Sequence, residues 1–184
     1  MKIVLIGYMG AGKTTLGKAL AQNMGLQFYD LDWWIEEKAG CTIAQIFAQQ
    51  GEDAFREMER QALHEVIEKD DIVLSVGGGT PCFFDNIDYM NRQANTVYLN
   101  ASVETLKAHI RMGGSKRPLV DGKSDEELTE YITASLQKRE PYYRQATYQV
   151  QIATITREEQ IDDYVEEIQR RVKSLDFNHR RWKS

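Results

Sequence analysis

Cysteine and long apolar runs are both scarce in this sequence. Its two cysteines, Cys41 and Cys82, fit no metal-binding or redox spacing, which favours a reducing compartment. No stretch of 18 or more apolar residues is present, so no segment is expected to span a membrane. The apolar start of the chain runs at once into glycines and Lys13, unlike a signal peptide. We therefore expect a cytoplasmic location.

An excess of positive charge is missing as well. The 23 Lys and Arg residues are outnumbered by 28 Asp and Glu residues, which argues against a nucleic-acid-binding surface. The 184 residues contain neither an internal repeat nor a linker. We expect a monomeric single domain over residues 1–175, with no nucleic-acid or membrane partner. The basic stretch 176–184 is expected to be a flexible tail, with a lipid or RNA contact as the alternative.

Short apolar runs alternate with helical patterns along the chain. Strands are predicted over residues 2–6, 26–30, 71–76, 95–100 and 147–153. Helices are predicted over residues 13–24, 33–68 (in pieces, broken at Gly51), 85–93, 102–113, 124–139 and 156–172. Capping boxes are predicted for Thr42 with Gln45, Ser124 with Glu127, and Thr156 with Glu159. This alternation predicts an α/β fold, in which a mostly parallel sheet has helices on both faces.

Residues 7–14, GYMGAGKT, match the phosphate-binding pattern G-x-x-x-x-G-K-[ST]. Glycines let backbone N–H groups turn towards phosphate oxygens, and the helix expected to begin at Lys13 directs its positive end at the same anion. The ammonium group of Lys13 suits the β- and γ-phosphates, and the hydroxyl of Thr14 suits Mg²⁺. Because the pattern follows a predicted strand and opens a predicted helix, it indicates nucleotide binding rather than a chance glycine turn.

Carboxylates for catalysis are expected from Asp30 and Asp32, because the strand ending in Ser75 and Val76 lacks one. At i and i+2 on an extended strand end, both aspartates would point to the same side. We interpret one as helping to bind hydrated Mg²⁺ and the other as accepting the proton of a substrate hydroxyl. Ordinary helix-capping carboxylates are the alternative.

Arginines indicate how an anionic substrate is held. Arg56 has Glu59 one helical turn away to fix its guanidinium group, with a loose surface ion pair as the alternative. Arg139 lies near the predicted end of a helix, and Arg117 lies in the loop 111–123, rich in Gly, Pro and charge. We expect two arginines to clamp a substrate anion and the loop arginine to close over the transferring phosphoryl group.

Three consecutive glycines, Gly77, Gly78 and Gly79, follow the third predicted strand. Glycines carry no side chain, so that backbone N–H groups can approach a ligand closely. A plain turn rarely needs all three, and we place them in the substrate site.

The motifs occur in the order GYMGAGKTT, DLD, GEDAFREME, SVGGG, RPL and REPYY. In this order, over nearly the whole chain, they resemble the shikimate kinase family. The resemblance implies a three-layer P-loop kinase fold with a five-stranded parallel sheet flanked by helices. It also implies a substrate-binding helical segment at about 31–60 and a lid at about 111–124.

For the nucleotide, the resemblance implies a site in the first motif. The ATP phosphates are expected at Gly10, Ala11, Gly12, Lys13, Thr14 and Thr15. Mg²⁺ is expected at Thr14, with Asp30 and Ser75 reaching it through water. Arg117 and Lys13 are expected to stabilise the charge of the γ-phosphoryl group. Arg111 is expected to stack on the adenine base.

For the acceptor, the resemblance implies that Asp32 deprotonates the attacking hydroxyl of shikimate. The carboxylate of shikimate is expected to bind Arg56 and Arg139, and the glycine segment 77–79 is expected to contact the substrate. Phe47 and Phe55 are expected to form an apolar wall beside the ring, or simply to pack in the core. The three histidines, His64, His109 and His179, match no family role and are interpreted as incidental.

The implied activity is transfer of the γ-phosphoryl group of MgATP to the 3-hydroxyl of shikimate. The alternatives are a kinase for another small acceptor, such as gluconate or a nucleoside monophosphate, and an interaction module that binds nucleotide without transferring it. The arginines alone do not exclude a sugar acid, which also has a carboxylate and hydroxyls.

Overall fold

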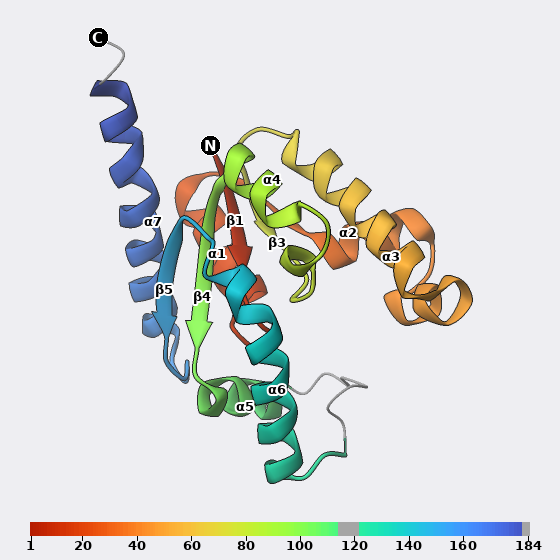
Figure 1. Cartoon of the computed structure of the whole chain (residues 1–184). Helices are drawn as coiled ribbons and strands as arrows, with labels where there is room; N and C mark the ends of the chain where they lie inside the picture. Colours follow the sequence, from red (N-terminus) through yellow and green to blue (C-terminus); the bar gives the residue numbers. More distant parts are fainter. Residues whose placement is uncertain (114–121, 182–184) are drawn as a thin grey trace.

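The chain folds around one parallel sheet whose five strands have the order β2-β3-β1-β4-β5 (Figure 1). The computed structural model describes the backbone of residues 1–113 and 122–181 and the side chains of residues 1–113 and 122–174. The strands are β1 (Lys2–Ile6), β2 (Gln27–Asp30), β3 (Ile72–Ser75), β4 (Asn95–Ala101) and β5 (Tyr148–Ile152). Every neighbouring pair is parallel, which confirms the predicted sheet.

Helices cover both faces of the sheet, so the fold has three layers. They are α1 (Lys13–Met24), α2 (Leu31–Ala39), α3 (Ile43–Ile67), α4 (Asn86–Gln93), α5 (Val103–Met112), α6 (Asp125–Tyr143) and α7 (Glu158–Arg181), with the short 3₁₀ helix η1 (Thr80–Cys82). In Figure 1, α4 and α6 lie in front of the sheet, and α1 and α7 pack against each other on the other face.

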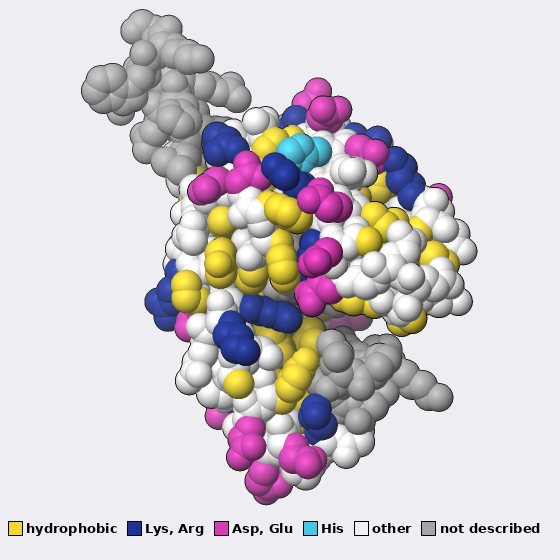
Figure 2. Space-filling view, turned by 45° about the vertical axis from the view of Figure 1, so that its right-hand side comes forward, with side chains coloured by type: hydrophobic (Ala, Val, Ile, Leu, Met, Phe, Trp, Pro, Cys, Tyr) yellow, Lys and Arg dark blue, Asp and Glu magenta, His cyan; other side chains and the backbone are white. Residues whose placement is uncertain are grey.

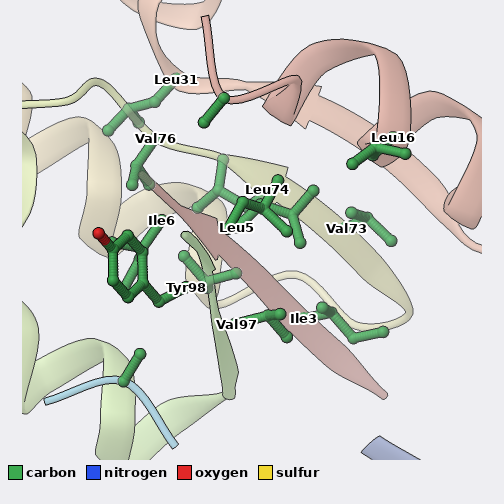
Figure 3. Close-up of a cluster of buried hydrophobic side chains, with 14 of the residues drawn as sticks. Ile3, Leu5, Ile6, Leu16, Leu31, Val73, Leu74, Val76, Val97 and Tyr98 are labelled. Carbon is green, nitrogen blue, oxygen red and sulfur yellow. The ribbon is translucent and has the colours of Figure 1, made fainter. Parts of the chain in front are cut away.

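The middle strand β1 is apolar from Ile3 to Ile6 because the fold covers it on both sides. All of these residues are fully buried, and Figure 3 shows Ile3, Leu5 and Ile6 among side chains of β3 and β4. A strand buried on both faces has no polar face, which is why it reads as a continuous apolar run. This core fixes the strand ends on which the site is built.

The carboxyl ends of β1, β2 and β3 meet at one edge of the sheet because the strands are parallel. Ser75, at the end of β3, pairs with Leu5 on one side and with Asp30 on the other. The P-loop, residues 7–14, leaves β1 at this edge, and the glycine segment 77–79 leaves β3 beside it. The sheet thereby gathers three motifs that lie far apart in the sequence.

Helix α3 is broken at Gly51, whose backbone (φ 84°, ψ 176°) lies in a region that essentially only glycine enters. In an unbroken helix, residues 47 and 55 would lie about 12 Å apart along the axis. The rings of Phe47 and Phe55 instead have centroids 4.6 Å apart. The break predicted at Gly51 therefore folds the two pieces of the helix towards each other.

The predicted end of α6 near Arg139 is wrong, because the helix continues through Pro141 to Tyr143. Proline is unfavourable inside a helix, since it lacks the N–H group and crowds the preceding turn. Here it lies only in the last turn, and the fully buried ring of Tyr143 holds that turn in the core.

Helix α7 differs from the prediction at both ends. It begins at Glu158, so that Gln160, not the predicted Glu159, accepts hydrogen bonds from the backbone N–H groups of Thr156 and Arg157. Its backbone stays helical to Arg181, beyond the domain boundary predicted at residue 175. No Gly or Pro lies within this span to end the helix.

The surface carries charges of both signs. Figure 2 shows Lys and Arg side chains interspersed with Asp and Glu side chains over the described part of one face. None of the described helices is long and apolar enough to cross a lipid bilayer. Cys41 and Cys82 are free thiols.

Replacing Gly51 by Ala should lower the free energy of unfolding by about 1–3 kcal/mol, because a Cβ is strained in this backbone region. Gln49→Ala, at an exposed position of the same helix, should change it by less than about 0.5 kcal/mol. Urea unfolding measures both values. Equal stability of the two variants would show that the break does not depend on glycine.

Candidate active site

A cavity of about 610 Å³ opens at the carboxyl edge of the sheet. The P-loop, the ends of β2 and β3, the glycine segment, α5 and the loop after β5 contribute to it. Its lining residues are Met9, Gly10, Gly12, Lys13, Thr14, Thr15, Asp30, Asp32, Ser75, Val76, Gly77, Gly78, His109, Met112, Gly113 and Ile155. The cavity therefore brings together most residues of the predicted phosphate and metal sites, and part of the predicted acceptor site.

The P-loop adopts positive-φ backbone conformations that favour glycine at Gly7, Gly10 and Gly12. Gly10 has φ 83°, and Gly12, the N-cap of α1, has φ 90°. Ala11, between them, is fully buried and does not line the cavity. The Nζ atom of Lys13 donates to the Gly7 carbonyl at 2.8 Å, which places the ammonium group across the loop. A nucleotide phosphate fits this cradle, because the positive end of α1 and the ammonium group of Lys13 can both stabilise its negative charge.

Asp30 and Asp32 line the same cavity, although not by the predicted geometry. Asp30 ends β2 and is the N-cap of α2, and its Oδ1 accepts from the N–H groups of Asp32 at 3.1 Å and Trp33 at 3.4 Å. Asp32 therefore lies in the first turn of a helix. The extended i, i+2 arrangement is wrong because the capping carboxylate favours a helix start directly after it.

Burial, together with repulsion from the carboxylates of Asp30 and Glu59, raises the pKa of Asp32 from 3.8 to about 6. The ammonium group of Lys13 opposes this rise in pKa. A carboxylate whose pKa lies close to neutral pH is suited to accept a proton from a hydroxyl group.

Arg56 is held by a buried carboxylate and an aromatic ring. Glu59, only 1% exposed, accepts from Nη1 of Arg56 at 2.8 Å, which confirms the predicted pair. The other Glu59 oxygen accepts from the hydroxyl of Thr80 at 2.5 Å. The guanidinium group lies 4.0 Å from the centroid of the Phe83 ring and also pairs with Glu52. Such a pair fixes the direction of the guanidinium group, unlike a loose surface ion pair.

Arg139 is held by tyrosines. Its guanidinium group lies 5.4 Å from the centroid of the Tyr8 ring. The hydroxyl of Tyr143 donates to the Gly78 carbonyl at 2.5 Å, and burial raises the pKa of Tyr143, so the hydroxyl stays protonated. Within the described part of the chain Arg139 forms no ion pair, whereas Arg56 forms two. The charge of Arg139 is therefore available to an anion.

The glycine segment makes room for the carboxylates. A Cβ atom at Gly77 would lie 3.2 Å from oxygens of both Asp32 and Glu59. None of the three glycines has φ in the left-handed region. Their missing side chains, and not their conformational freedom, explain the sequence at these positions.

The same segment makes room for the guanidinium groups. A Cβ atom at Gly78 would lie 3.1 Å from Nη1 of Arg139, and one at Gly79 would lie 2.8 Å from Nη2 of Arg56. Gly78 lines the cavity, but Gly79 does not. The space at Gly79 is filled by Arg56, so the missing side chain at this position makes room for the arginine.

Arg117 and residues 114–121 of the predicted lid lie outside the described residues. Arg111 does not line the cavity, because its Nη2 donates to the carbonyl of Lys123 at 2.9 Å. Phe55 is buried, and the half-buried Phe47 packs against it.

Several lining residues were not predicted from the sequence, and His109 is the one among them that can ionise. Its interpretation as incidental is wrong, since it lines the cavity and forms hydrogen bonds with Gly10 and Ile155. The only sequence signal is a polar residue between the buried Leu106 and Ile110 on the inner side of α5.

Oxygen donors suited to Mg²⁺ meet where the hydroxyl of Thr14 donates to Oδ2 of Asp30 at 3.1 Å. Among the described residues, no group of three or more His, Cys, Asp or Glu is placed to hold a metal ion. Mg²⁺ fits Thr14 and Asp30 if phosphate oxygens and water supply the remaining ligands, as is usual for this ion.

The raised pKa of Asp32 makes its ionised form unfavourable in the folded chain. Because the folded pKa lies above the unfolded one, the contribution of Asp32 to the free energy of unfolding should fall as pH rises from 3.8 through about 6. Asp32→Asn removes this fall, so its stability relative to the native chain should rise by about 2 kcal/mol between about pH 4 and about pH 8.

Chemical unfolding at the two pH values measures this change. Asp53→Asn, which replaces an exposed carboxylate on α3, is the matched control and should show a much smaller change. A pH-independent difference between Asp32→Asn and the native chain would contradict the raised pKa.

Comparison with known proteins shows the family of the chain. The family model "Shikimate kinase" matches residues 9–171. A shikimate kinase of Phocaeicola vulgatus is 49% identical over 93% of this chain and 98% of its own length. The crystal structure of shikimate kinase from Bacteroides thetaiotaomicron is 44% identical, has a TM-score of 0.89, and is matched over 94% of this chain and 98% of its own. Shikimate kinase from Acinetobacter baumannii, solved in complex with shikimate, is 34% identical with a TM-score of 0.80 over 94% of this chain and 93% of its own. The chain therefore belongs to the shikimate kinase family.

Proposed function

We propose that this chain transfers the γ-phosphoryl group of ATP to the 3-hydroxyl of shikimate, giving shikimate 3-phosphate and ADP. The observation that carries the proposal is that Asp32, with its raised pKa, lines one cavity with the P-loop and packs against the glycine segment that also contacts Arg56 and Arg139. The relative solved with shikimate supports the same acceptor here.

Residues 10–15 hold the ATP phosphates. The amides at the start of α1 and the ammonium group of Lys13 neutralise their charge. Thr14 would hold Mg²⁺, and Asp30 and Ser75, which line the same cavity, would assist through water. When bound, Mg²⁺ supplies further neutralisation of phosphate charge.

Asp32 accepts the proton of the attacking hydroxyl. The transition state of phosphoryl transfer is loose, so that positioning and charge stabilisation supply most of the rate enhancement. Asp32 lies in the first turn of α2, and Asp30 fixes that turn by capping it. The base is thereby held by the fold and not by the substrate.

Arg56 and Arg139 bind the carboxylate of shikimate. Arg139 brings a charge that no ion pair in the described part of the chain balances, and Arg56 brings a guanidinium group oriented by Glu59. Guanidinium groups recognise carboxylates through paired hydrogen bonds. The glycine segment contacts both arginines, which favours a carboxylate site beside it.

Arg117 stabilises the charge of the γ-phosphoryl group together with Lys13, and the lid at about 111–124 excludes water. This part of the proposal is based on the family resemblance. We further propose that the chain is a monomer in the cytoplasm. Its free cysteines favour the cytoplasm, because this compartment is reducing.

The assay that tests the proposal is release of ADP from MgATP with and without shikimate. Release that requires shikimate is expected, and gluconate or a nucleoside monophosphate should not replace it. Activity with one of these alternatives would reassign the acceptor. Nucleotide binding without transfer to any acceptor would favour an interaction module.

Asp32→Asn should lower kcat by a factor of about 10²–10⁴, because the proton acceptor is removed. The affinity for ATP should change little, and Asp53→Asn should keep native kcat. In the native chain, kcat/KM should fall as pH drops below about 6, because Asp32 becomes protonated. Steady-state rates across pH test both expectations, and near-native kcat in Asp32→Asn would exclude Asp32 as the base.

Arg139→Ala should raise KM for shikimate by a factor of about 10–100, because a charged hydrogen-bond donor to the carboxylate is lost. KM for ATP should stay within a factor of about 2. Arg144→Ala removes an exposed arginine of the next turn, paired with Glu140, and should leave both constants unchanged. Similar increases in both KM values would contradict the carboxylate clamp.

A further inference from the structure

His109 joins two segments of the cavity wall that lie far apart in the sequence. From α5, its Nδ1 lies 2.7 Å from the carbonyl oxygen of Gly10 in the P-loop. Its Nε2 lies 2.8 Å from the backbone nitrogen of Ile155, in the loop between β5 and α7. One imidazole ring therefore contacts a phosphate-binding segment and a separate loop at the same time.

The chemistry of these partners fixes the state of the ring. The Gly10 carbonyl can only accept a hydrogen bond, so Nδ1 of His109 must carry the hydrogen. The Ile155 N–H group can only donate, so Nε2 must be the unprotonated acceptor. Only the neutral Nδ1–H tautomer satisfies both partners, whereas an imidazolium would direct a second N–H group at the N–H of Ile155.

The residues that His109 joins also face the cavity. Gly10, Ile155 and His109 line it, together with Met112 and Gly113 at the end of α5. Gly10 has little freedom beneath α5, because a Cβ atom there would lie 3.1 Å from the Leu106 carbonyl. The side chain of Ile155 also approaches the P-loop directly, because a Cβ atom at Gly12 would lie 3.8 Å from its Cδ1, and the imidazole ring adds a hydrogen bond to each of the two segments.

We propose that His109 is a positioning residue for the nucleotide, which holds the P-loop and the loop at Ile155 as two fixed parts of one ATP-binding wall. The inference rests on the proposed function in that it takes ATP as the phosphoryl donor. Without the ring, each segment loses a partner and the wall must be ordered when the nucleotide binds, which weakens binding. His109 contacts no group assigned to shikimate.

Substitution of His109 tests the proposal through the affinity for ADP, measured by calorimetry without shikimate. His109→Ala should raise the Kd for ADP and the KM for ATP by a factor of about 10, and KM for shikimate should change much less. His64→Ala is the matched control, because it removes another half-buried histidine, stacked on Tyr89 at 3.8 Å and absent from the cavity lining. It should lower stability and leave the Kd for ADP unchanged.

Two conservative variants separate the hydrogen bonds. His109→Asn retains a donor for the Gly10 carbonyl, and His109→Gln retains an acceptor for the Ile155 N–H group. Each should give an ADP affinity between those of the native chain and His109→Ala. They also keep the test valid if the alanine variant does not fold.

The ring nitrogens of His109 give a direct readout by ¹⁵N NMR. The proposal expects a protonated Nδ1 and an unprotonated Nε2 in the nucleotide-free chain, and the opposite tautomer would overturn it. So would an unchanged Kd for ADP in a folded His109→Ala, since the histidine would then serve stability alone. Failure of shikimate-dependent turnover in the native chain would instead count against the proposed acceptor, because ADP binding is measured without it.

Discussion

The absence of side chains at residues 77–79 is the constraint on which the site depends. Charged groups of both signs approach this segment so closely that a Cβ atom would lie within 3.2 Å of them at each position. Asp32 and Glu59 meet it at Gly77, and Arg56 meets it at Gly79. Burial raises the pKa of Asp32, and repulsion from the carboxylates of Asp30 and Glu59 adds to the rise. The groups proposed to bind an anion and to accept a proton therefore lie around one stretch of backbone.

The parallel sheet places this stretch beside the phosphate cradle. β1 and β3 are neighbours, so the P-loop and the glycine segment leave the sheet side by side. β2 is the next strand, and its last residue, Asp30, caps α2 and contacts Thr14 of the P-loop. The proposed donor and acceptor sites therefore lie side by side at the carboxyl edge of the sheet, where ligands generally bind in such folds.

Much of this arrangement is predictable from local patterns. The P-loop has a fixed spacing, the buried strands have an apolar run, and Arg56 and Glu59 are one turn apart on a helix. The direction of Asp32 was not predictable from strand geometry, because Asp30 turns the chain into a helix at once. The contacts of His109 span 99 and 46 residues, and no local pattern encodes them. The packing of Arg56 against Gly79 is likewise a tertiary contact.

We propose that the fold directs the Asp32 carboxylate at the hydroxyl that receives the phosphoryl group. A crystal structure of the chain with shikimate and an unreactive ATP analogue would show this contact. We expect the 3-hydroxyl oxygen within about 2.6–3.2 Å of an Asp32 oxygen, and the shikimate carboxylate at Arg56 and Arg139. A 3-hydroxyl directed away from Asp32, with both ligands bound in the cavity, would exclude this role for Asp32.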